Sequence, residues 1–177
     1  GLKWSALEGG TRVPCILRFP GVIPSGEVSD KLTTAIDLLP TLAGACGIKL
    51  KEGPAIVPKM DGLNLWGSLQ GKAKTHPRSN LLYWHGWAMP QAIRVGDWKL
   101  YLDEVKEITG ANKAPVLINL SKDPAEAKDL AAEYPGKVKN MKTLAEKLLK
   151  DIEENSIPLG GPADPRKNTP KRGQWIP

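Results

Sequence analysis

The segment QAIRVGDWKLYL, residues 91–102, decides the kind of sheet that the chain forms. Two strand-like runs flank the dipeptide Gly96-Asp97, which is typical of a tight hairpin turn. Strands joined by so short a turn run antiparallel. We therefore expect a hairpin of residues 91–95 and 98–102, with Arg94, Asp97 and Lys99 at its turn or on an exposed strand face.

Further strand-like runs and a helix extend this hairpin on both sides. Residues 80–84 and 115–120 have strand-like composition and predict an antiparallel sheet. Pro135 can open a helix, and after it apolar residues recur at intervals of three and four: Val138, Met141, Leu144, Leu148 and Ile152. Burying each of these side chains contributes about 1.5–3 kcal/mol before entropic costs. A helix over residues 136–154 is therefore expected to cover the sheet.

The N-terminal third has a different pattern. Residues 13–19 form an apolar run between Gly-Gly and Pro-Gly, which is typical of a strand buried on both faces in a parallel or mixed sheet. We expect a short strand near residues 32–36 and a helix from about 38 to 46. Asp37 is its expected N-cap and Gly47 its C′ residue, and its leucines should face the core: Leu38, Leu39 and Leu42.

Residues 49–79 separate these two patterns. They are rich in Gly, Pro and Lys and contain one possible short helix at residues 64–69, so they predict a long surface crossing. The last residues, 158–177, form a Pro/Gly/Lys-rich tail.

Charge and cysteine content narrow the possible functions. The net charge is +6, but the basic residues of 137–150 are followed or interrupted by acidic ones, so no nucleic-acid partner is expected. No run approaches the ~18 apolar residues of a membrane span, and no membrane role is expected. Cys15 and Cys46 form no zinc motif. They are expected to be two buried free thiols, with a single bridge as the alternative.

Six motifs, in a fixed order over residues 1–130, resemble the formylglycine-dependent sulfatases of the arylsulfatase family. The family pattern begins with Gly-x-Lys, followed five residues after the lysine by Glu-Gly-Gly-x-Arg-x-Pro. The matching residues here are Lys3 with Glu8-Gly9-Gly10-x-Arg12-Val13-Pro14, Ser29-Asp30 with Ile36-Asp37-Leu38-Leu39-Pro40-Thr41-Leu42, Ala43-Gly44-Ala45-Cys46-Gly47-Ile48, Met60-Asp61-Gly62-Leu63-Asn64-Leu65, Ala92-Ile93-Arg94-x-Gly96-Asp97-Trp98-Lys99-Leu100, and Ile118-Asn119-Leu120-x-x-Asp123-Pro124-x-Glu126-x-x-Asp129-Leu130.

The resemblance implies an α/β protein with the alkaline-phosphatase-like sulfatase fold. In that fold a large mixed sheet carries the active site, and a smaller C-terminal antiparallel sheet packs beside it. Residues 1–75 would then be the C-terminal end of the large catalytic domain with the surface crossing. Residues 76–157 would be the antiparallel sheet and helix subdomain, and residues 158–177 the tail.

The resemblance also implies hydrolysis of sulfate esters by a formylglycine nucleophile with a calcium ion. The formylglycine motif of the family is Cys/Ser-x-Pro/Ala-x-Arg, and neither Cys15-Ile16-Leu17-Arg18 nor Cys46-Gly47-Ile48-Lys49 fits it. We expect the nucleophile and the calcium ligands upstream of residue 1 and assign no metal ligand here. The chain alone is expected to be inactive.

Three residues are the candidate site residues. The resemblance assigns Lys3 as catalytic, because a fixed ammonium would stabilise negative charge on the leaving oxygen and the sulfuryl oxygens. His85 and Trp87 would contact substrate at the pocket rim. The alternatives are a solvated lysine, a structural histidine and a packing tryptophan. Glu8 and Arg12 are expected to form a structural pair at the Gly-Gly turn.

The expected partners are a sulfated small molecule or carbohydrate and the upstream part of the same enzyme. Members of the family are commonly exported, so a periplasmic or secreted location is expected. Two alternatives stay open. One is a basic, non-catalytic module that binds sulfated or phosphorylated polymers through residues 137–150 and the tail. The other is a phosphohydrolase of the same superfamily.

Overall fold

The computed structural model describes residues 5–50, 59–85, 89–102 and 115–156, with the side chains of His85 and Met89 excepted. Its contacts divide the chain into two compact units. One consists of the described residues up to Val13 and from Asn80 onward, and the other spans Pro14–Ser79. The domain boundaries expected at residues 75 and 157 remain predictions. Within the described segments, no helix combines the length and the apolar character needed to cross a membrane.

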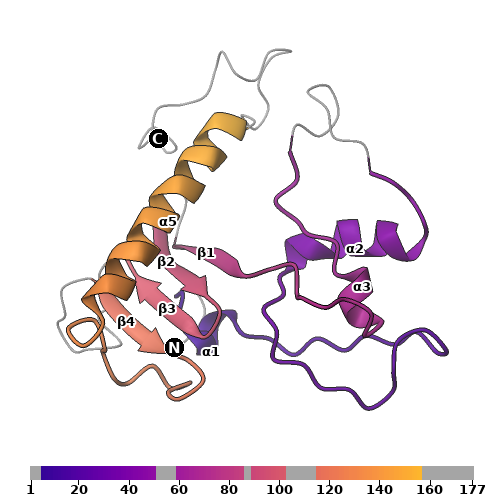
Figure 1. Ribbon diagram of the computed structural model, residues 1–177, viewed down its shortest axis with the longest axis horizontal. Coiled ribbons are helices and arrows are strands. Elements are labelled where there is room, and N and C mark those ends of the chain that lie inside the picture. The colour runs from indigo at the N-terminus through magenta and orange to yellow at the C-terminus, as the bar shows by residue number, and fades with distance from the viewer. Residues whose placement is uncertain (1–4, 51–58, 86–88, 103–114, 157–177) are drawn as a thin grey trace. The chain divides into compact units, whose positions relative to one another are not determined.

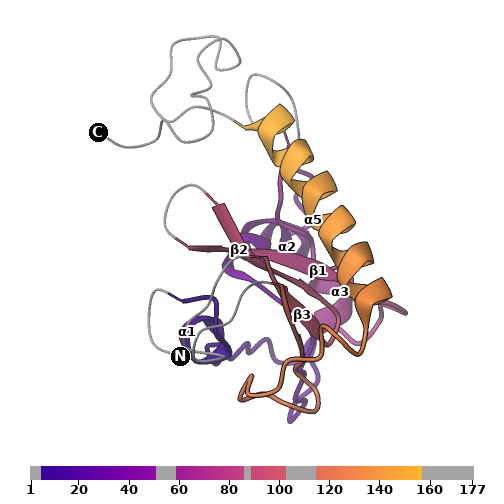
Figure 2. The same cartoon turned by 90° about the vertical axis from the view of Figure 1, so that its left-hand side faces the viewer.

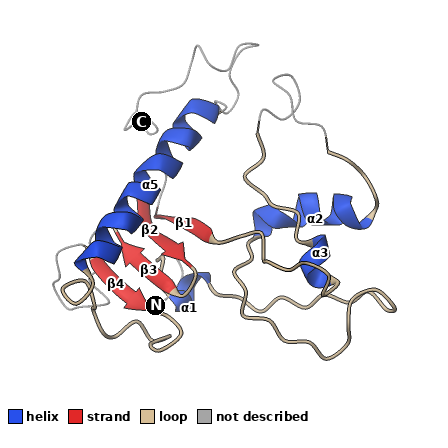
Figure 3. Cartoon of the chain, viewed as in Figure 1, coloured by secondary structure: helices blue, strands red, loops and turns tan. Residues whose placement is uncertain are grey.

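The first unit is built on an antiparallel sheet with the strand order β1-β2-β3-β4 (Figures 1 and 3). Its strands are β1 (Asn80–His85), β2 (Met89–Val95), β3 (Trp98–Tyr101) and β4 (Val116–Asn119). Val95 pairs with Trp98 across the β2–β3 turn, where Gly96 has a φ of +57°. That left-handed conformation suits glycine because it has no Cβ. The predicted hairpin and sheet are confirmed.

Helix α5 (Pro135–Asn155) covers one face of this sheet (Figure 2). Its buried Met141 and Ala145 pack on side chains from all four strands: Leu82, Ile93, Leu100 and Leu117. The other residues of the predicted stripe, Val138, Leu144, Leu148 and Ile152, pack at the edge of the same cluster. The sequence prediction for this helix and its buried face is confirmed.

The opposite face of the sheet is also covered, by the N-terminal segment. Ala6 and Leu7 are buried there against Ala92, Tyr101 and Ile118, together with Val116. The short helix α1 (Glu8–Thr11) follows directly, on the side of the sheet away from α5 (Figure 2). Because side chains alternate between faces along a strand, Lys99 lies on the same face as Tyr101 and is completely buried. The prediction that Lys99 lies at a turn or on an exposed strand face is wrong, because this second layer was not foreseen.

The second unit contains three short helical elements. A 3₁₀ turn at Ala35–Asp37 leads into α2 (Leu38–Ala45), and α3 (Trp66–Leu69) follows later. The helices expected near residues 38–46 and 64–69 are confirmed. Gly47, with a φ of +70°, stands just after the end of α2 as predicted. The strand expected at residues 32–36 is absent, because Thr34 and Asp37 form a capping box that starts a helical turn there.

Other expectations for this unit are also wrong. Residues 13–19 form no strand, and Ile16 is 93% exposed, because the described residues offer this run no neighbouring strand to pair with. In α2 the buried residues are Pro40, Thr41 and Ala43, whereas its leucines are exposed: Leu38, Leu39 and Leu42. Cys15 and Cys46 are free, but both are exposed rather than buried.

Candidate functional site

The three predicted site residues fall where the structure gives no side-chain geometry. Lys3 and Trp87 lie outside the described residues. His85 is the last residue of β1, and its backbone pairs with Met89 of β2. The roles of all three therefore stay predictions. The structure does describe residues 5–8, which follow Lys3 closely in the sequence, and the side chains that hold them.

Glu8, five residues after Lys3, belongs to a buried group of charged side chains, which we call the Lys99 cluster. Its members are Glu8 of α1, Lys99 and Tyr101 of β3, and Glu126 of the loop after β4. Lys99 Nζ lies 2.8 Å from Glu8 Oε1 and 2.9 Å from Glu126 Oε1. The Tyr101 hydroxyl donates a hydrogen bond of 2.6 Å to the same Glu126 oxygen.

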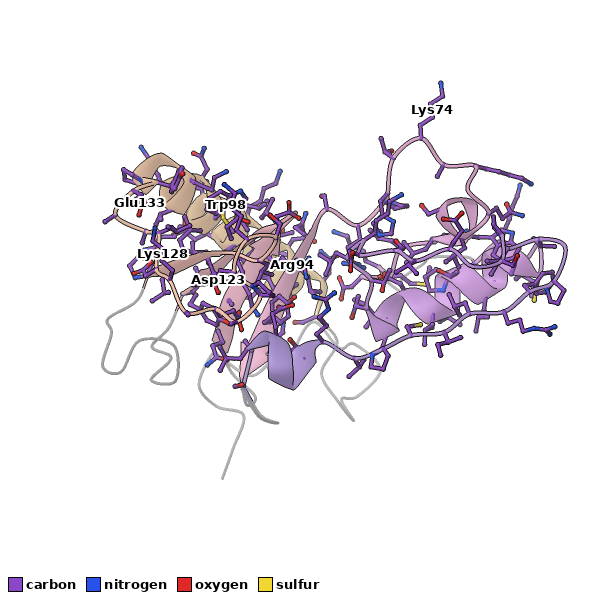
Figure 4. All side chains as sticks on the ribbon, turned by 90° about the horizontal axis from the view of Figure 1, so that it is seen from below. Lys74, Arg94, Trp98, Asp123, Lys128 and Glu133 are labelled. Atoms are coloured by element: carbon purple, nitrogen blue, oxygen red, sulfur yellow. The ribbon has the colours of Figure 1, made fainter. Side chains whose placement is uncertain are left out.

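The cluster balances its charges, which is what allows it to be buried. Arg94 of β2, labelled in Figure 4, places Nη1 3.8 Å from Glu8 Oε2. With Lys99 and Glu126, the group then holds two carboxylates and two cations. An unpaired buried charge would cost several kcal/mol. Lys99 Nζ also lies 4.7 Å from the centre of the Tyr83 ring, which offers it a favourable cation–π contact.

Burial raises the pKa of the Tyr101 hydroxyl, and its hydrogen bond to Glu126 raises it further. Burial, followed by the negative charge of Glu8, also raises the pKa of Tyr83. Tyr101 therefore keeps its proton and stays a hydrogen-bond donor to Glu126 at physiological pH.

The backbone of the N-terminal segment is held by two side-chain acceptors. The Ala6 N–H donates to Gln91 Oε1 over 2.8 Å, and the Glu8 N–H donates to Glu126 Oε2 over 2.7 Å. Gln91 comes from β2 and is itself buried. The N–H group of Ala6, just before α1, and that of Glu8, the first residue of α1, are thus satisfied by side chains inside the protein.

Glu126 reaches the cluster because of an unusual backbone conformation. Its φ of +59° is left-handed, which costs a residue with a Cβ roughly 1–2 kcal/mol. The turn around it is fixed by Asp123, whose backbone oxygen accepts from the Glu126 N–H and whose Oδ2 accepts from the Lys128 N–H. This strained turn directs the Glu126 carboxylate inward.

The second unit has a buried ion pair of its own, between Asp37 and Arg78. Arg78 Nε donates to Asp37 Oδ2 over 2.7 Å, and Arg78 Nη2 donates to Asp37 Oδ1 and to the Asp61 backbone oxygen. The Leu63 and Thr34 N–H groups also donate to the Asp37 carboxylate. Burial alone would raise the pKa of Asp37, but the hydrogen bonds and the charge of Arg78 outweigh it and hold this pKa below its usual value.

Two glycines allow the segments around this pair to approach closely. A Cβ on Gly62 would lie 2.1 Å from the Ile36 backbone oxygen, and one on Gly44 would lie 2.4 Å from the Asn64 side chain. The motifs at residues 36–42 and 43–48 are thereby packed on the motif at residues 60–65. Motifs that are distant in the sequence meet in both units.

No group of three or more His, Cys, Asp or Glu side chains gathers at a possible metal position within the described ranges. The two carboxylates of the Lys99 cluster already share an ammonium group. The described residues therefore do not fit a calcium ion, and we derive no catalytic step through one.

Comparison with known proteins identifies the family. The family described as N-sulphoglucosamine sulphohydrolase, C-terminal, matches residues 3–156. A sulfatase of Formosa agariphila is 36% identical over 149 residues, which cover 75% of this chain and 25% of that protein. Human steryl-sulfatase is 30% identical over 154 residues, covering 73% of this chain and 26% of its own length. The chain thus spans about a quarter of these relatives.

A solved structure shows the same fold. It is described as a complex with its substrate, D-glucosamine-2-N,6-O-disulfate, and it superposes with a TM-score of 0.56 over 86% of this chain and 29% of that one, at 22% identity. This agreement bears out the alkaline-phosphatase-like sulfatase fold inferred from the motifs. From its motifs, its fold and its match over residues 3–156, we conclude that the chain belongs to the sulfatases, in the N-sulphoglucosamine sulphohydrolase C-terminal family.

Proposed function

We propose that this chain is the C-terminal part of an enzyme that hydrolyses sulfate esters. The family match over residues 3–156 carries the proposal, because it takes in Lys3 and the motifs that follow it. The formylglycine nucleophile and the calcium ion are assigned to an upstream part of the enzyme. Within this chain, Lys3 is the proposed catalytic residue, and His85 and Trp87 are the proposed substrate contacts.

The chemical role of Lys3 follows from the charge that develops in the reaction. When the ester bond to sulfur breaks, negative charge grows on the leaving oxygen, and a fixed ammonium beside that oxygen lowers the barrier. The stabilisation matters most for leaving groups that hold negative charge poorly. This dependence distinguishes a catalytic lysine from one at the protein surface.

The proposed substrate is a sulfated carbohydrate or small molecule, processed outside the cytoplasm. Support comes from the solved structure with the same fold, which is described as bound to a disulfated glucosamine. We also propose that the isolated 177-residue chain is inactive, because none of its cysteines or serines stands in the motif that becomes formylglycine.

The test uses the full-length protein with its upstream part. We expect it to release sulfate from 4-nitrophenyl sulfate or a sulfated monosaccharide. Replacing the upstream Cys or Ser of the formylglycine motif by Ala should abolish release, whereas Cys15→Ala and Cys46→Ala serve as matched controls and should keep it. Hydrolysis of a phosphate monoester without any sulfate release would instead support the phosphohydrolase alternative.

A further inference from the structure

We propose that the Lys99 cluster, together with Gln91, positions Lys3 for catalysis, so that Gln91, Lys99, Tyr101 and Glu126 act on the reaction through the N-terminal segment. This inference rests on the proposed function, which makes Lys3 catalytic. None of these four residues is proposed to touch the substrate. They are positioning residues, and their effect should appear only where the lysine is present.

The cluster and Gln91 hold residues that follow Lys3 closely in the sequence. Ala6 lies three residues after Lys3 and Glu8 lies five after it, and these are the residues whose N–H groups are held by Gln91 and Glu126. The Glu8 side chain is held as well, through Lys99. Backbone and side chain are therefore both fixed within one short stretch.

These contacts leave residues 6–8 little freedom to move. Gln91, Lys99, Tyr101 and Glu126 are all buried, and three of them stand on the β2–β3 hairpin, whose strands are hydrogen-bonded in register. Any shift of Glu8 would separate its carboxylate from Lys99 and its N–H from Glu126, leaving buried polar groups without partners. The segment is thus held in one arrangement.

The two faces of the sheet are covered in different ways. Ala6 and Leu7 make apolar contacts on this face, as the stripe of α5 does on the other, but this face also carries the buried charged side chains of the cluster. A charged, directional anchor adds precision of placement. Such precision is what a catalytic group needs, because displacing a reacting group by about 1 Å can lower a rate by about 10²-fold.

The experiment measures kcat and KM of the full-length enzyme with two aryl sulfates. One is 4-nitrophenyl sulfate, which has a good leaving group, and the other is phenyl sulfate, which has a poorer one. The variants are Glu126→Gln and the milder Tyr101→Phe. Glutamine has one oxygen in place of two, so Glu126→Gln loses either the acceptor for the Glu8 N–H or the acceptor shared by Lys99 and Tyr101. The matched control is Glu133→Gln, because Glu133 is exposed and forms an ion pair of 3.2 Å with Lys128, which is also exposed (Figure 4).

We expect Glu126→Gln to lower kcat by about 10–10²-fold, with little change in KM. The loss should be greater for phenyl sulfate than for 4-nitrophenyl sulfate, as it should be for Lys3→Ala. A purely structural role would lower the amount of folded enzyme and reduce both rates by the same factor. Tyr101→Phe should show the same selectivity with a smaller loss, and it keeps the test valid if Glu126→Gln does not fold.

A double-mutant cycle completes the test. If Glu126 acts through Lys3, adding Glu126→Gln to Lys3→Ala should cost little further activity, because the group that it positions is already gone. Equal losses for both aryl sulfates, or a full additional loss in the Lys3→Ala background, would overturn the inference. If Lys3→Ala itself keeps normal activity, the proposed catalytic role of Lys3 fails instead, so the two failures are distinguishable.

Discussion

Lys99 supplies the cation that two buried carboxylates of the first unit share. Its ammonium group is completely buried between the carboxylates of Glu8 and Glu126. We expect Lys99→Met to lower the free energy of unfolding by about 3–5 kcal/mol, because two buried carboxylates lose their shared partner. Urea denaturation would measure this, with Lys128→Met, at an exposed ion pair, as the control that should change it by less than about 0.5 kcal/mol.

A second residue-scale prediction concerns Lys3. In the full-length enzyme, Lys3→Ala should lower kcat by roughly 10²–10³, the range observed when one preorganised charge donor is removed. Steady-state kinetics with an aryl sulfate would measure the effect. A kcat within about twofold of the parent would place Lys3 among the ordinary surface lysines.

Asp37 makes stability depend on pH at the acidic end. The pKa of Asp37 is lower in the folded protein than its usual value of 3.8, so its ion pair contributes stability above that pH. The contribution should be lost as the pH falls from 3.8 through the lower, folded pKa, because the carboxyl group is then protonated. Urea denaturation between neutral and acidic pH should show a steeper loss for the parent than for Asp37→Asn. Parallel curves would contradict this.

At the scale of elements, α5 is held by its apolar stripe. Met141 is buried on the sheet, whereas Lys142 beside it is exposed. Met141→Ala should destabilise the protein by about 2–5 kcal/mol through the cavity it leaves, and Lys142→Ala should have almost no effect. Thermal or urea denaturation would compare the two. Equal effects would mean that the helix does not depend on this contact.

The sequence predicted those elements whose signals are local. The hairpin could be read from Gly96-Asp97, and α5 from the spacing of Val138 and Met141. The burial of Lys99 could not be read in this way, because its partners Glu8 and Glu126 lie 91 and 27 residues away. The motif positions of all three residues were the available signal, but a motif does not say which residues meet.

Apolar composition misled the prediction in the second unit for a related reason. Ile16 and Leu39 are apolar, yet both are exposed, since burial depends on a neighbour as well as on composition. The roles of Lys3, His85 and Trp87 depended on the family resemblance alone. No periodicity or spacing within this chain would have singled them out.

At the scale of the whole molecule, the exposed apolar side chains of the second unit predict association. Ile16 is 93% exposed and Val28 is 89% exposed, and the α2 leucines are exposed as well. We expect the isolated chain to self-associate, because exposed apolar area of this kind is an aggregation liability. Light scattering would measure its size, and co-expression with the upstream part should reduce the association. A stable monomer with no affinity for that part would contradict the prediction.

The same isolated chain should release no sulfate from an aryl sulfate in the presence of calcium. None of its residues stands in the formylglycine motif, so we expect sulfate release to be no faster than the uncatalysed reaction in buffer. Mixing it with the upstream part should restore activity if the two parts assemble. Activity of the chain alone would overturn the division of roles between the two parts.

The contact between Glu8 and Glu126 has a consequence for the order of events during protein synthesis. The two residues are 118 positions apart, so a ribosome adding about 5–20 residues per second makes Glu126 about 6–24 s after Glu8. Throughout that interval the Glu8 N–H group lacks its Glu126 acceptor. This contact can therefore form only when translation has passed residue 126, and a chain truncated before that point should lack it.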